Sequence, residues 1–140
     1  MIGKDQQSML KSGRNDVAVH AHIPKYFYFR LNGKLPPGRI QFTYCTPGTS
    51  FKAYVSFKDK KPGPKNNDSE ITLTSHQKST KEIPFPFVEH GNGEKSYTST
   101  FAYICILSHV DTAISMRIET KEPRSAYTEK VSMALMMKIN

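Results

Sequence analysis

The stretch RIQFTYCTPGTSFKAYVSFK, residues 39–58, decides the fold class because apolar and polar side chains alternate on both sides of a turn. Every second position is apolar in each half, and these positions are Ile40, Phe42, Tyr44, Phe51, Ala53, Val55 and Phe57. The intervening TPGTS contains the proline and glycine typical of a tight turn. A period of two is typical of antiparallel strands that bury one face, so we expect two such strands here.

The same alternation recurs along most of the chain. We expect further strands at residues 17–23, 25–31, 70–75, 82–88, 96–108 and 113–120. The segment 96–108 is the longest and most apolar of these, which favours a central place in a sheet. Pro84 and Pro86 cannot donate to a ladder, so 82–88 should lie at a sheet edge or remain unpaired. Seven or eight short strands predict an all-β fold, an antiparallel β-sandwich or jelly roll.

The two ends of the chain stand outside this pattern. We interpret residues 1–16 as an N-terminal extension and residues 17–140 as one sandwich domain. Residues 127–139 alternate like a strand, but their Ala, Leu, Met, Glu and Lys favour a short C-terminal helix. The sequence leaves both structures open for this segment.

The cellular location is predicted from two absences. No apolar run approaches the ~18–20 residues that cross a membrane. Residues 1–16 also lack the apolar centre of a signal peptide. We therefore expect a cytoplasmic protein, with the nucleus as the alternative, unless a leader or a larger parent chain has been removed.

The two cysteines each lie in an apolar run, Cys45 in FTYCT and Cys105 in AYICIL. We expect two reduced, buried thiols, because free cysteine is among the most buried residue types. A disulfide between them is the alternative, and it would indicate an oxidising compartment. Burial raises the pKa of a thiol, so neither cysteine is a good candidate nucleophile.

No motif of a catalytic or metal site stands out. The sequence contains no GxGxxG, GxxxxGK[ST], GxSxG or HExxH motif. His20 and His22 could share a metal from one face of a strand, but the spacing indicates no third ligand. The segment NNDSE, residues 66–70, is a poor calcium loop because lysines surround it. We therefore expect no enzyme activity, no cofactor and no metal.

Several segments resemble one known family. The resemblance is carried, in chain order, by KYFYFRL (25–31), GRIQFTYCTPGTSFKAYVSFKDKKP (38–62), STFAYICILS (99–108) and AISMRIE (113–119). This order of an aromatic strand, a strand before a turn, a YVS strand entering a proline-containing loop and two closing strands is similar to the pre-peptidase C-terminal (PPC) domain. The resemblance covers residues 17–120. It implies a small β-sandwich that accompanies enzymes and binds or shields without chemistry of its own.

The positive charge is concentrated in one part of this basic protein. Residues 25–65 hold nine of the twenty lysines and arginines but one of the twelve acids, and the formal net charge of the chain is +8. Such asymmetry produces a local positive field that suits an acidic partner. If strands 39–45 and 51–58 pair, their polar faces bring bases together with Tyr54. The predicted partner-binding residues are Arg39, Lys52, Tyr54, Lys58, Lys60, Lys61 and Lys65.

The segment KDKKPGPK, residues 58–65, has two interpretations that the sequence supports equally. It is either part of a binding surface or a solvated hairpin loop, in which Pro and Gly form the turn and lysines keep the edge soluble. As a nuclear localisation signal it is interrupted by Asp59 and two prolines.

We hypothesise a non-catalytic β-sandwich interaction module that docks an acidic protein surface or tail, as a structural subunit of a larger assembly. The alternative is nucleic-acid binding, because basic residues alternate with Tyr26 and Tyr28 and surround Tyr54. The sequence identifies neither the partner nor the oligomeric state.

Overall fold

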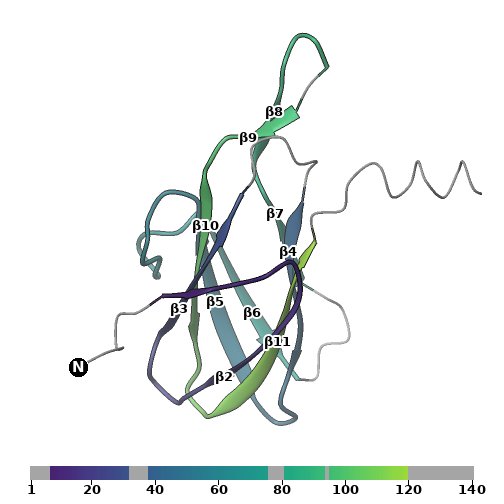
Figure 1. The fold of residues 1–140 in the computed structure, drawn as a ribbon. Coiled ribbons are helices and arrows are strands. Elements are labelled where there is room, and N and C mark those ends of the chain that lie inside the picture. Colours follow the sequence, from purple (N-terminus) through teal and green to yellow (C-terminus); the bar gives the residue numbers. More distant parts are fainter. Residues whose placement is uncertain (1–6, 32–37, 76–80, 94, 120–140) are drawn as a thin grey trace, which may run out of the picture.

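The computed structural model describes residues 7–31, 38–75, 81–93 and 95–119. Within these ranges the chain forms eleven β-strands and no helix (Figure 1). The all-β fold predicted from the sequence is thus confirmed. The segment 127–139, where we expected a helix or a strand, lies outside the described residues.

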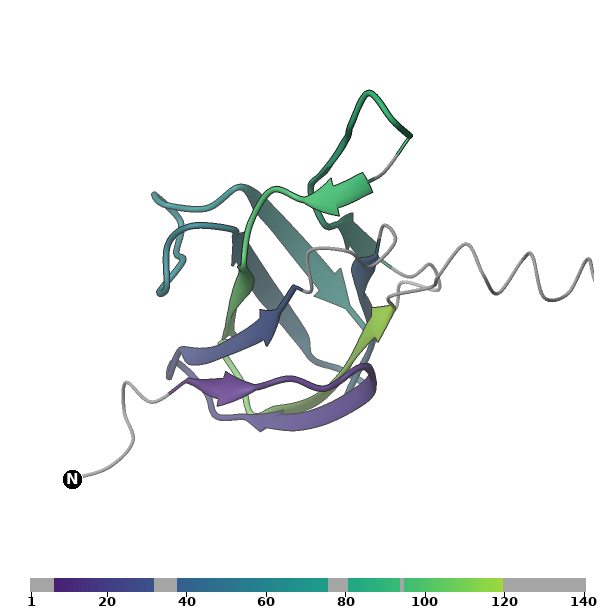
Figure 2. The ribbon, with the colours of Figure 1, turned by 45° about the horizontal axis from the view of Figure 1, so that its top comes forward.

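Two sheets face each other across the core (Figure 2). Sheet A contains, in spatial order, β1 (Ser8–Met9), β3 (Lys25–Arg30), β10 (Phe101–Leu107), β5 (Ser50–Ser56) and β6 (Ser69–Thr74). Sheet B contains β2 (Gly13–Val19), β11 (Thr112–Glu119), β4 (Arg39–Cys45) and β7 (Lys81–Pro84). A separate two-stranded ribbon is formed by β8 (Phe87–Glu89) and β9 (Lys95–Tyr97). All pairs are antiparallel except β1 with β3, which is parallel.

The turn between β4 and β5 carries the chain from sheet B to sheet A. Gly48 adopts a φ of 82° there, a left-handed conformation that favours glycine. The apolar positions of both strands point inward except Tyr44, which the sequence pattern places with them but which is 48% exposed. Phe42 and Phe51 meet in the core with ring centroids 6.0 Å apart. The decisive stretch therefore forms one strand of each sheet and joins the two layers.

Two of the placements predicted from the sequence are confirmed. The apolar segment 96–108 supplies β10, which occupies the centre of sheet A. The proline-containing segment 82–88 supplies β7 at an edge of sheet B. Both segments are interrupted, however: β9 and β10 are separate strands, and so are β7 and β8. These breaks and the two-residue β1 raise the strand number above the predicted seven or eight.

The N-terminal predictions need correction. β1 and the first half of β2 pair within the two sheets, so the sandwich begins before residue 17. β2 ends at Val19 rather than continuing to residue 23, which leaves His20 and His22 outside the strand. His22 has a φ of 63° in the turn that follows, and its N–H donates to the Ser108 carbonyl at 2.7 Å. The two histidines therefore do not share a strand face.

Aromatic rings close one end of the core. Phe85, between β7 and β8, stacks on Phe29 with centroids 6.0 Å apart and meets Tyr97 edge-on at 6.1 Å. Phe57 also contacts the Phe85 ring edge-on, with ring centroids 6.3 Å apart. Each fully buried side chain of this size stabilises the fold by about 1.5–3 kcal/mol through apolar burial.

The unequal burial of Phe42 and Tyr44 on β4 provides a test of the fold, because strict alternation would place both residues on the same face. Phe42 is fully buried, whereas Tyr44 is 48% exposed on the same strand. We expect Phe42→Ala to lower the free energy of unfolding by about 3–5 kcal/mol, because it opens a cavity. Tyr44→Ala should cost within about 0.5 kcal/mol, as for other exposed positions. Urea unfolding measures both, and an equal loss in the two variants would contradict the observed register.

Candidate binding surface

The predicted binding residues are divided between the two sheets. We expected Arg39 and Lys52 to share a face if their strands paired. β4 and β5 lie in different sheets and do not pair, so the two residues do not share a face. Arg39 lies on the outer face of sheet B, where its Nη2 donates to Glu119 Oε2 at 3.2 Å. Its Nε is 3.0 Å from Glu82 Oε2 without a well-aligned hydrogen bond, so this second contact is an ion pair only. Two carboxylates thus compensate the charge of Arg39.

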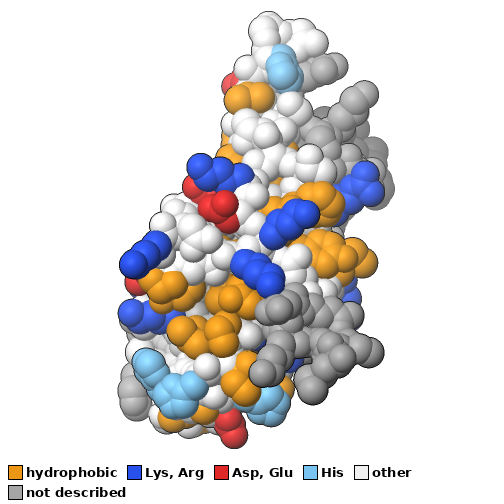
Figure 3. Space-filling view, turned by 90° about the vertical axis from the view of Figure 1, so that its left-hand side faces the viewer, with side chains coloured by type: hydrophobic (Ala, Val, Ile, Leu, Met, Phe, Trp, Pro, Cys, Tyr) orange, Lys and Arg blue, Asp and Glu red, His pale blue; other side chains and the backbone are white. Residues whose placement is uncertain are grey.

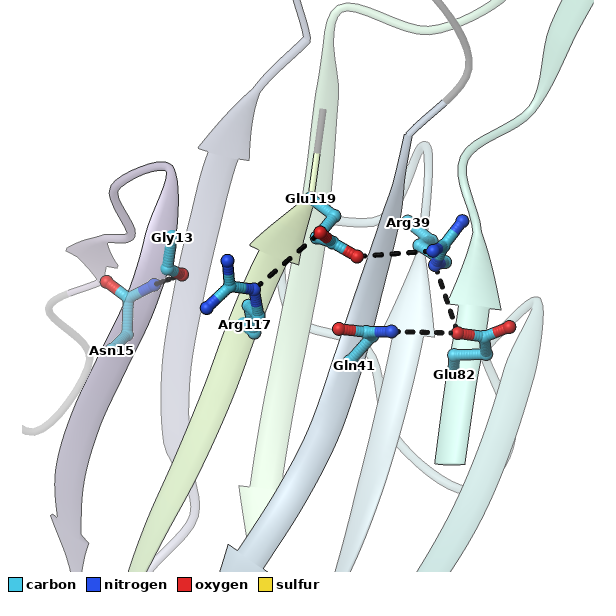
Figure 4. A network of polar contacts seen from close by, with 7 residues as sticks. All are labelled: Gly13, Asn15, Arg39, Gln41, Glu82, Arg117 and Glu119. Carbon is cyan, nitrogen blue, oxygen red and sulfur yellow. Dashed lines mark hydrogen bonds and ion pairs between the residues drawn. The ribbon is translucent and has the colours of Figure 1, made fainter. Parts of the chain in front are cut away.

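This compensation extends across sheet B. Figure 4 shows Arg117, Glu119, Arg39 and Glu82 in a chain of ion pairs over β11, β4 and β7. Gln41 joins it by donating from Nε2 to Glu82 Oε2 at 3.0 Å. Arg39 is therefore held between two carboxylates and is not a member of the candidate surface.

The four loop lysines form a real cluster on the other sheet. They belong to residues 57–68, here the basic loop, which connects the antiparallel strands β5 and β6 and is the teal loop at the left of Figure 1. Lys58, Lys60, Lys61 and Lys65 are all exposed, as expected. The loop contains two acids, Asp59 and Asp68, so it carries a net positive charge.

The basic loop does not project freely from its hairpin. Lys61 Nζ lies 5.8 Å from the ring centroid of Tyr26 on β3, a cation–π distance. The Gln7 side-chain amide, beside β1, donates to the Lys60 carbonyl. Because β10 separates β3 from β5 in sheet A, the loop must cross the outer side of β10 to make these contacts.

Hydrogen bonds hold the loop at both ends. Asp68 Oδ2 accepts from the Phe57 N–H at 2.8 Å, and the Asp68 N–H donates to the Val55 carbonyl at 2.7 Å. At the tip, Asn66 Nδ2 donates to the Lys61 carbonyl at 2.9 Å, and Asn67 Nδ2 to the Gly63 carbonyl at 2.8 Å. Asn and Asp are common in turns for this reason. The lysines are thus presented from an ordered backbone.

The crossing buries side chains on the outer face of sheet A. Tyr26, Cys105 and Tyr54 form one row across β3, β10 and β5, and their side chains point away from the core. Tyr54 is nevertheless 4% exposed and Cys105 3% exposed. Burial, followed by the charge of Glu70, raises the pKa of Tyr54 above its usual value. Tyr54, which we predicted to contact a partner, is therefore not accessible on the surface.

The two thiols are buried, as expected, and neither forms a disulfide. Burial raises the pKa of the Cys105 thiol to about 11, and a hydrogen bond with Tyr26 opposes the shift. Cys45 lies on sheet B with its Sγ 3.5 Å from the Thr49 carbonyl. Cys105 is thus a protonated, unreactive thiol at neutral pH.

Lys52 is separate from the loop lysines. It lies half-exposed on the outer face of β5, where its Nζ is 3.9 Å from Glu70 Oε2. An exposed pair of this kind contributes about 0–1 kcal/mol. Lys52 therefore adds little positive charge to the candidate surface.

An aromatic row lies beside the basic loop and consists of Tyr28, Phe101 and Tyr103. Of these residues, Tyr28 alone was named from the sequence. Tyr28 on β3 and Phe101 on β10 meet edge-on with centroids 6.0 Å apart, and Phe101 lies 5.8 Å from Tyr103. All three are half-exposed on the outer face of sheet A. Figure 3 shows hydrophobic side chains gathered on this side of the molecule among lysine and arginine side chains. Alternation in residues 101–107 places Phe101 and Tyr103 on one face, but it does not indicate that β3 is their neighbour.

No metal centre is found in the part of the chain that the structure describes. His22 and His109 are in ring contact, with centroids 5.4 Å apart. Nowhere in residues 7–31, 38–75, 81–93 and 95–119 do three or more His, Cys, Asp or Glu side chains come together as a potential metal site. The same residues contain no helix long and apolar enough to cross a membrane.

Comparisons with protein-family models and with curated protein sequences give no match. A search of solved structures finds the PPC domain of a collagenase from Bacillus anthracis, with 7% identity, a TM-score of 0.54 and coverage of 81% of this chain and 95% of that chain. The fold is PPC-like. The resemblance deduced from the sequence motifs is therefore confirmed at the level of fold, which is all that 7% identity shows.

The search of solved structures also finds two further proteins. CorA, a surface-associated copper-binding protein of Methylomicrobium album BG8, has 7% identity and a TM-score of 0.50, covering 81% of this chain and 97% of that chain. PliG, a periplasmic inhibitor of g-type lysozyme from Salmonella Typhimurium, has 11% identity and a TM-score of 0.41. The match covers 81% of this chain and 98% of that chain.

Reactivity of Cys105 tests whether the basic loop covers sheet A. In a Cys45→Ala background, Cys105 should react slowly with a thiol reagent at pH 8, and the rate should rise about tenfold per pH unit towards pH 11 because the thiolate reacts. Asn67→Ala with Asp68→Ala removes loop contacts and should speed labelling by about tenfold or more.

The matched control is Cys45 in a Cys105→Ala background. Cys45 lies in the other sheet, so the same loop changes should leave its labelling rate unchanged. If loop release accelerates both thiols equally, the variant has opened the whole domain. If it accelerates neither, the loop does not cover Cys105.

Proposed function

We propose that this PPC-like sandwich is an interaction module that docks an acidic protein surface or tail through the basic loop. The proposal rests chiefly on one observation: four exposed lysines are carried by a loop that is hydrogen-bonded at both ends and packed against its own sheet. A binding segment that is already ordered loses less conformational entropy on association. The core of the interface is Lys58, Lys60, Lys61 and Lys65.

The fold comparison supports an accessory role. The PPC domain with the similar fold is one domain of a collagenase, which favours a part played within a larger protein or assembly. The copper binding of CorA is not carried over, because the described residues bring together no set of three potential ligands. A subunit that recruits or positions an acidic partner fits both the fold and the charge.

Association kinetics test the role of the loop. Lys58→Gln with Lys60→Gln removes two exposed charges and leaves the Lys61–Tyr26 contact in place. We expect this variant to bind a polyglutamate peptide several-fold more slowly than wild type at low salt, because surface charges steer encounter. The difference should shrink at 0.15 M salt, where the screening length is about 8 Å. Stopped-flow fluorescence measures both rates.

A charge-matched control uses Lys11→Gln with Lys81→Gln, which removes two lysines outside the loop. This control should associate at nearly the wild-type rate, and both variants should keep the wild-type melting temperature. Equal slowing in the two variants would show that net charge alone matters, and the basic loop would then be only a solvated hairpin connection.

Single-stranded nucleic acid is a second candidate partner, and the aromatic row favours it. Tyr28, Phe101 and Tyr103 lie half-exposed on the face that carries the lysines, which combines stacking surfaces with positive charge. Against it, Tyr54 is buried and cannot stack with a base.

Binding of a mixed-sequence oligonucleotide distinguishes the two candidates. Stacking contributes about 1–3 kcal/mol per base, so Tyr28→Ala or Tyr103→Ala should weaken oligonucleotide binding at least about fivefold. Neither change should affect polyglutamate binding. Fluorescence anisotropy at two salt concentrations measures this, and an oligonucleotide that binds weakly with no loss in the tyrosine variants removes the nucleic-acid candidate.

A further inference from the structure

The outer face of sheet B holds a hollow that lies away from the basic loop. Its volume is about 390 Å³, and its lining residues are Arg14, Thr43, Tyr44, Ser115 and Arg117. They come from β2, β4 and β11, whereas the basic loop lies over sheet A. Hollows of ≈ 300–1,000 Å³ are the usual size for small-molecule sites.

A β-bulge shapes this hollow. Ser115 pairs with Tyr44, but the next residue of β11, Met116, pairs with Phe42, so Thr43 is an extra residue in β4. Consequently Thr43 and Tyr44 are both exposed, although they are consecutive, while their neighbours Phe42 and Cys45 are buried. Bulges often redirect a side chain beside a functional site. Here the bulge turns the Tyr44 ring outward, leaving it 48% exposed.

Two arginines form one side of the hollow. Arg14 and Arg117 are register partners on β2 and β11, an arrangement of like charges that is unfavourable in itself. Each is held by a carboxylate through Nε: Arg14 to Asp16 at 2.9 Å and Arg117 to Glu119 at 3.8 Å. Both of these contacts use Nε, and neither involves an Nη group. Neither acid belongs to the lining, so among the described residues the hollow is lined by two cations and no carboxylate.

The two aliphatic hydroxyl groups in the lining, those of Thr43 and Ser115, present acceptors. Ser115 Oγ donates its hydrogen to Asp16 Oδ1 at 2.6 Å, and Thr43 Oγ1 donates to the Ser115 carbonyl at 3.4 Å. A hydroxyl that has donated its hydrogen still has lone pairs that accept. The hollow therefore suits a ligand with an oxyanion for the arginines and O–H donors for Thr43 and Ser115.

We propose that this hollow binds a sugar that carries an oxyanion, such as a sugar carboxylate, sulfate or phosphate. The arginine pair takes the oxyanion by charge-assisted hydrogen bonds, for which the planar guanidinium is well shaped. Thr43 and Ser115 accept hydrogen bonds from sugar hydroxyls, and the exposed Tyr44 ring covers the apolar face of the sugar ring. A free inorganic anion satisfies the arginines but leaves the tyrosine and the hydroxyl acceptors unused.

Amide NMR titration of the full chain tests the proposal with defined probes. These are glucuronate, glucose 6-sulfate, glucose 6-phosphate, neutral glucose and inorganic phosphate, all at one ionic strength. We expect at least one charged sugar to cause saturable shifts at residues 43–44 and 115, with an affinity at least about tenfold above those of glucose and phosphate. The three charged sugars reveal which oxyanion the site prefers.

Three variants locate the binding site. Arg117→Gln and Tyr44→Ala should each weaken the preferred sugar about tenfold or more. Arg30→Gln, which removes an exposed arginine from sheet A, should leave its affinity unchanged. The amide spectrum of each free variant shows that it is folded.

Several outcomes would overturn the proposal. Phosphate binding as tightly as glucose 6-phosphate would show a simple anion site without sugar recognition. Equal weakening by Arg30→Gln and Arg117→Gln would show a general charge effect. Shifts that stay linear for every probe at the highest concentration, or that map to other residues, would show that the hollow binds none of these ligands.

Discussion

The central strand β10 is apolar on both faces, and both faces must therefore be kept from water. Its inner residues Ala102, Ile104 and Ile106 are fully buried against sheet B. On the outer side, Cys105 is 3% exposed although none of the described strands forms a second sheet over it. The basic loop crosses this side from β5 towards β3, while Phe101 and Tyr103 on the same side remain half-exposed. A two-layer sandwich alone leaves this face open, so the path of the loop follows from the composition of β10.

The cover carries positive charge because lysine combines an apolar stem with a charged end. Stems can lie along an apolar surface while the ammonium groups stay in water. In Lys61 the ammonium nitrogen itself lies over the Tyr26 ring, 5.8 Å from its centroid. The same loop thus shields the row of Tyr26, Cys105 and Tyr54 and displays four lysines. Shielding and binding need not be separate properties of this segment.

Folding pairs some of the basic residues of segment 25–65 with acidic residues from later in the chain. Residues 25–65 are strongly basic, but Glu82 and Glu119 compensate Arg39, and Glu70 lies beside Lys52. These acids all follow residue 65 in the chain. The loop lysines are the members of the predicted set that folding gathers on an exposed, ordered segment. On sheet B, Arg39 and Arg117 lie within a network of ion pairs, and the hollow that we propose as a sugar site is lined by residues of β2, β4 and β11.

The sequence predicts the local structure well and the neighbours of each strand poorly. Alternation in residues 39–58 identifies β4 and β5 because side-chain burial imposes a period of two. It does not show that β4 pairs with β11, since pairing between distant strands depends on the packing of the whole chain. For that reason Arg39 was grouped with the wrong strand.

The same limit explains the other differences between sequence and structure. Tyr54 occupies an outward-facing position in the alternation of β5, yet it is 4% exposed in the folded protein. The bulge at Thr43 and the approach of Arg14 to Arg117 likewise depend on pairing with β11. His20 and His22 alternate like strand residues, but the chain turns at His22. Exposure of the loop lysines could be predicted, because proline, glycine and asparagine specify a turn from local sequence alone.

The most direct test of this account is a nuclear Overhauser measurement between the side chain of Lys61 and the ring of Tyr26 in the free protein. The structure places Lys61 Nζ 5.8 Å from the ring centroid, on a strand two positions away from the one that the loop leaves. We expect cross-peaks between the Lys61 methylene protons and the Tyr26 ring protons. Absence of these cross-peaks, with contacts of the loop confined to β5 and β6, would show a free hairpin loop and would contradict the account.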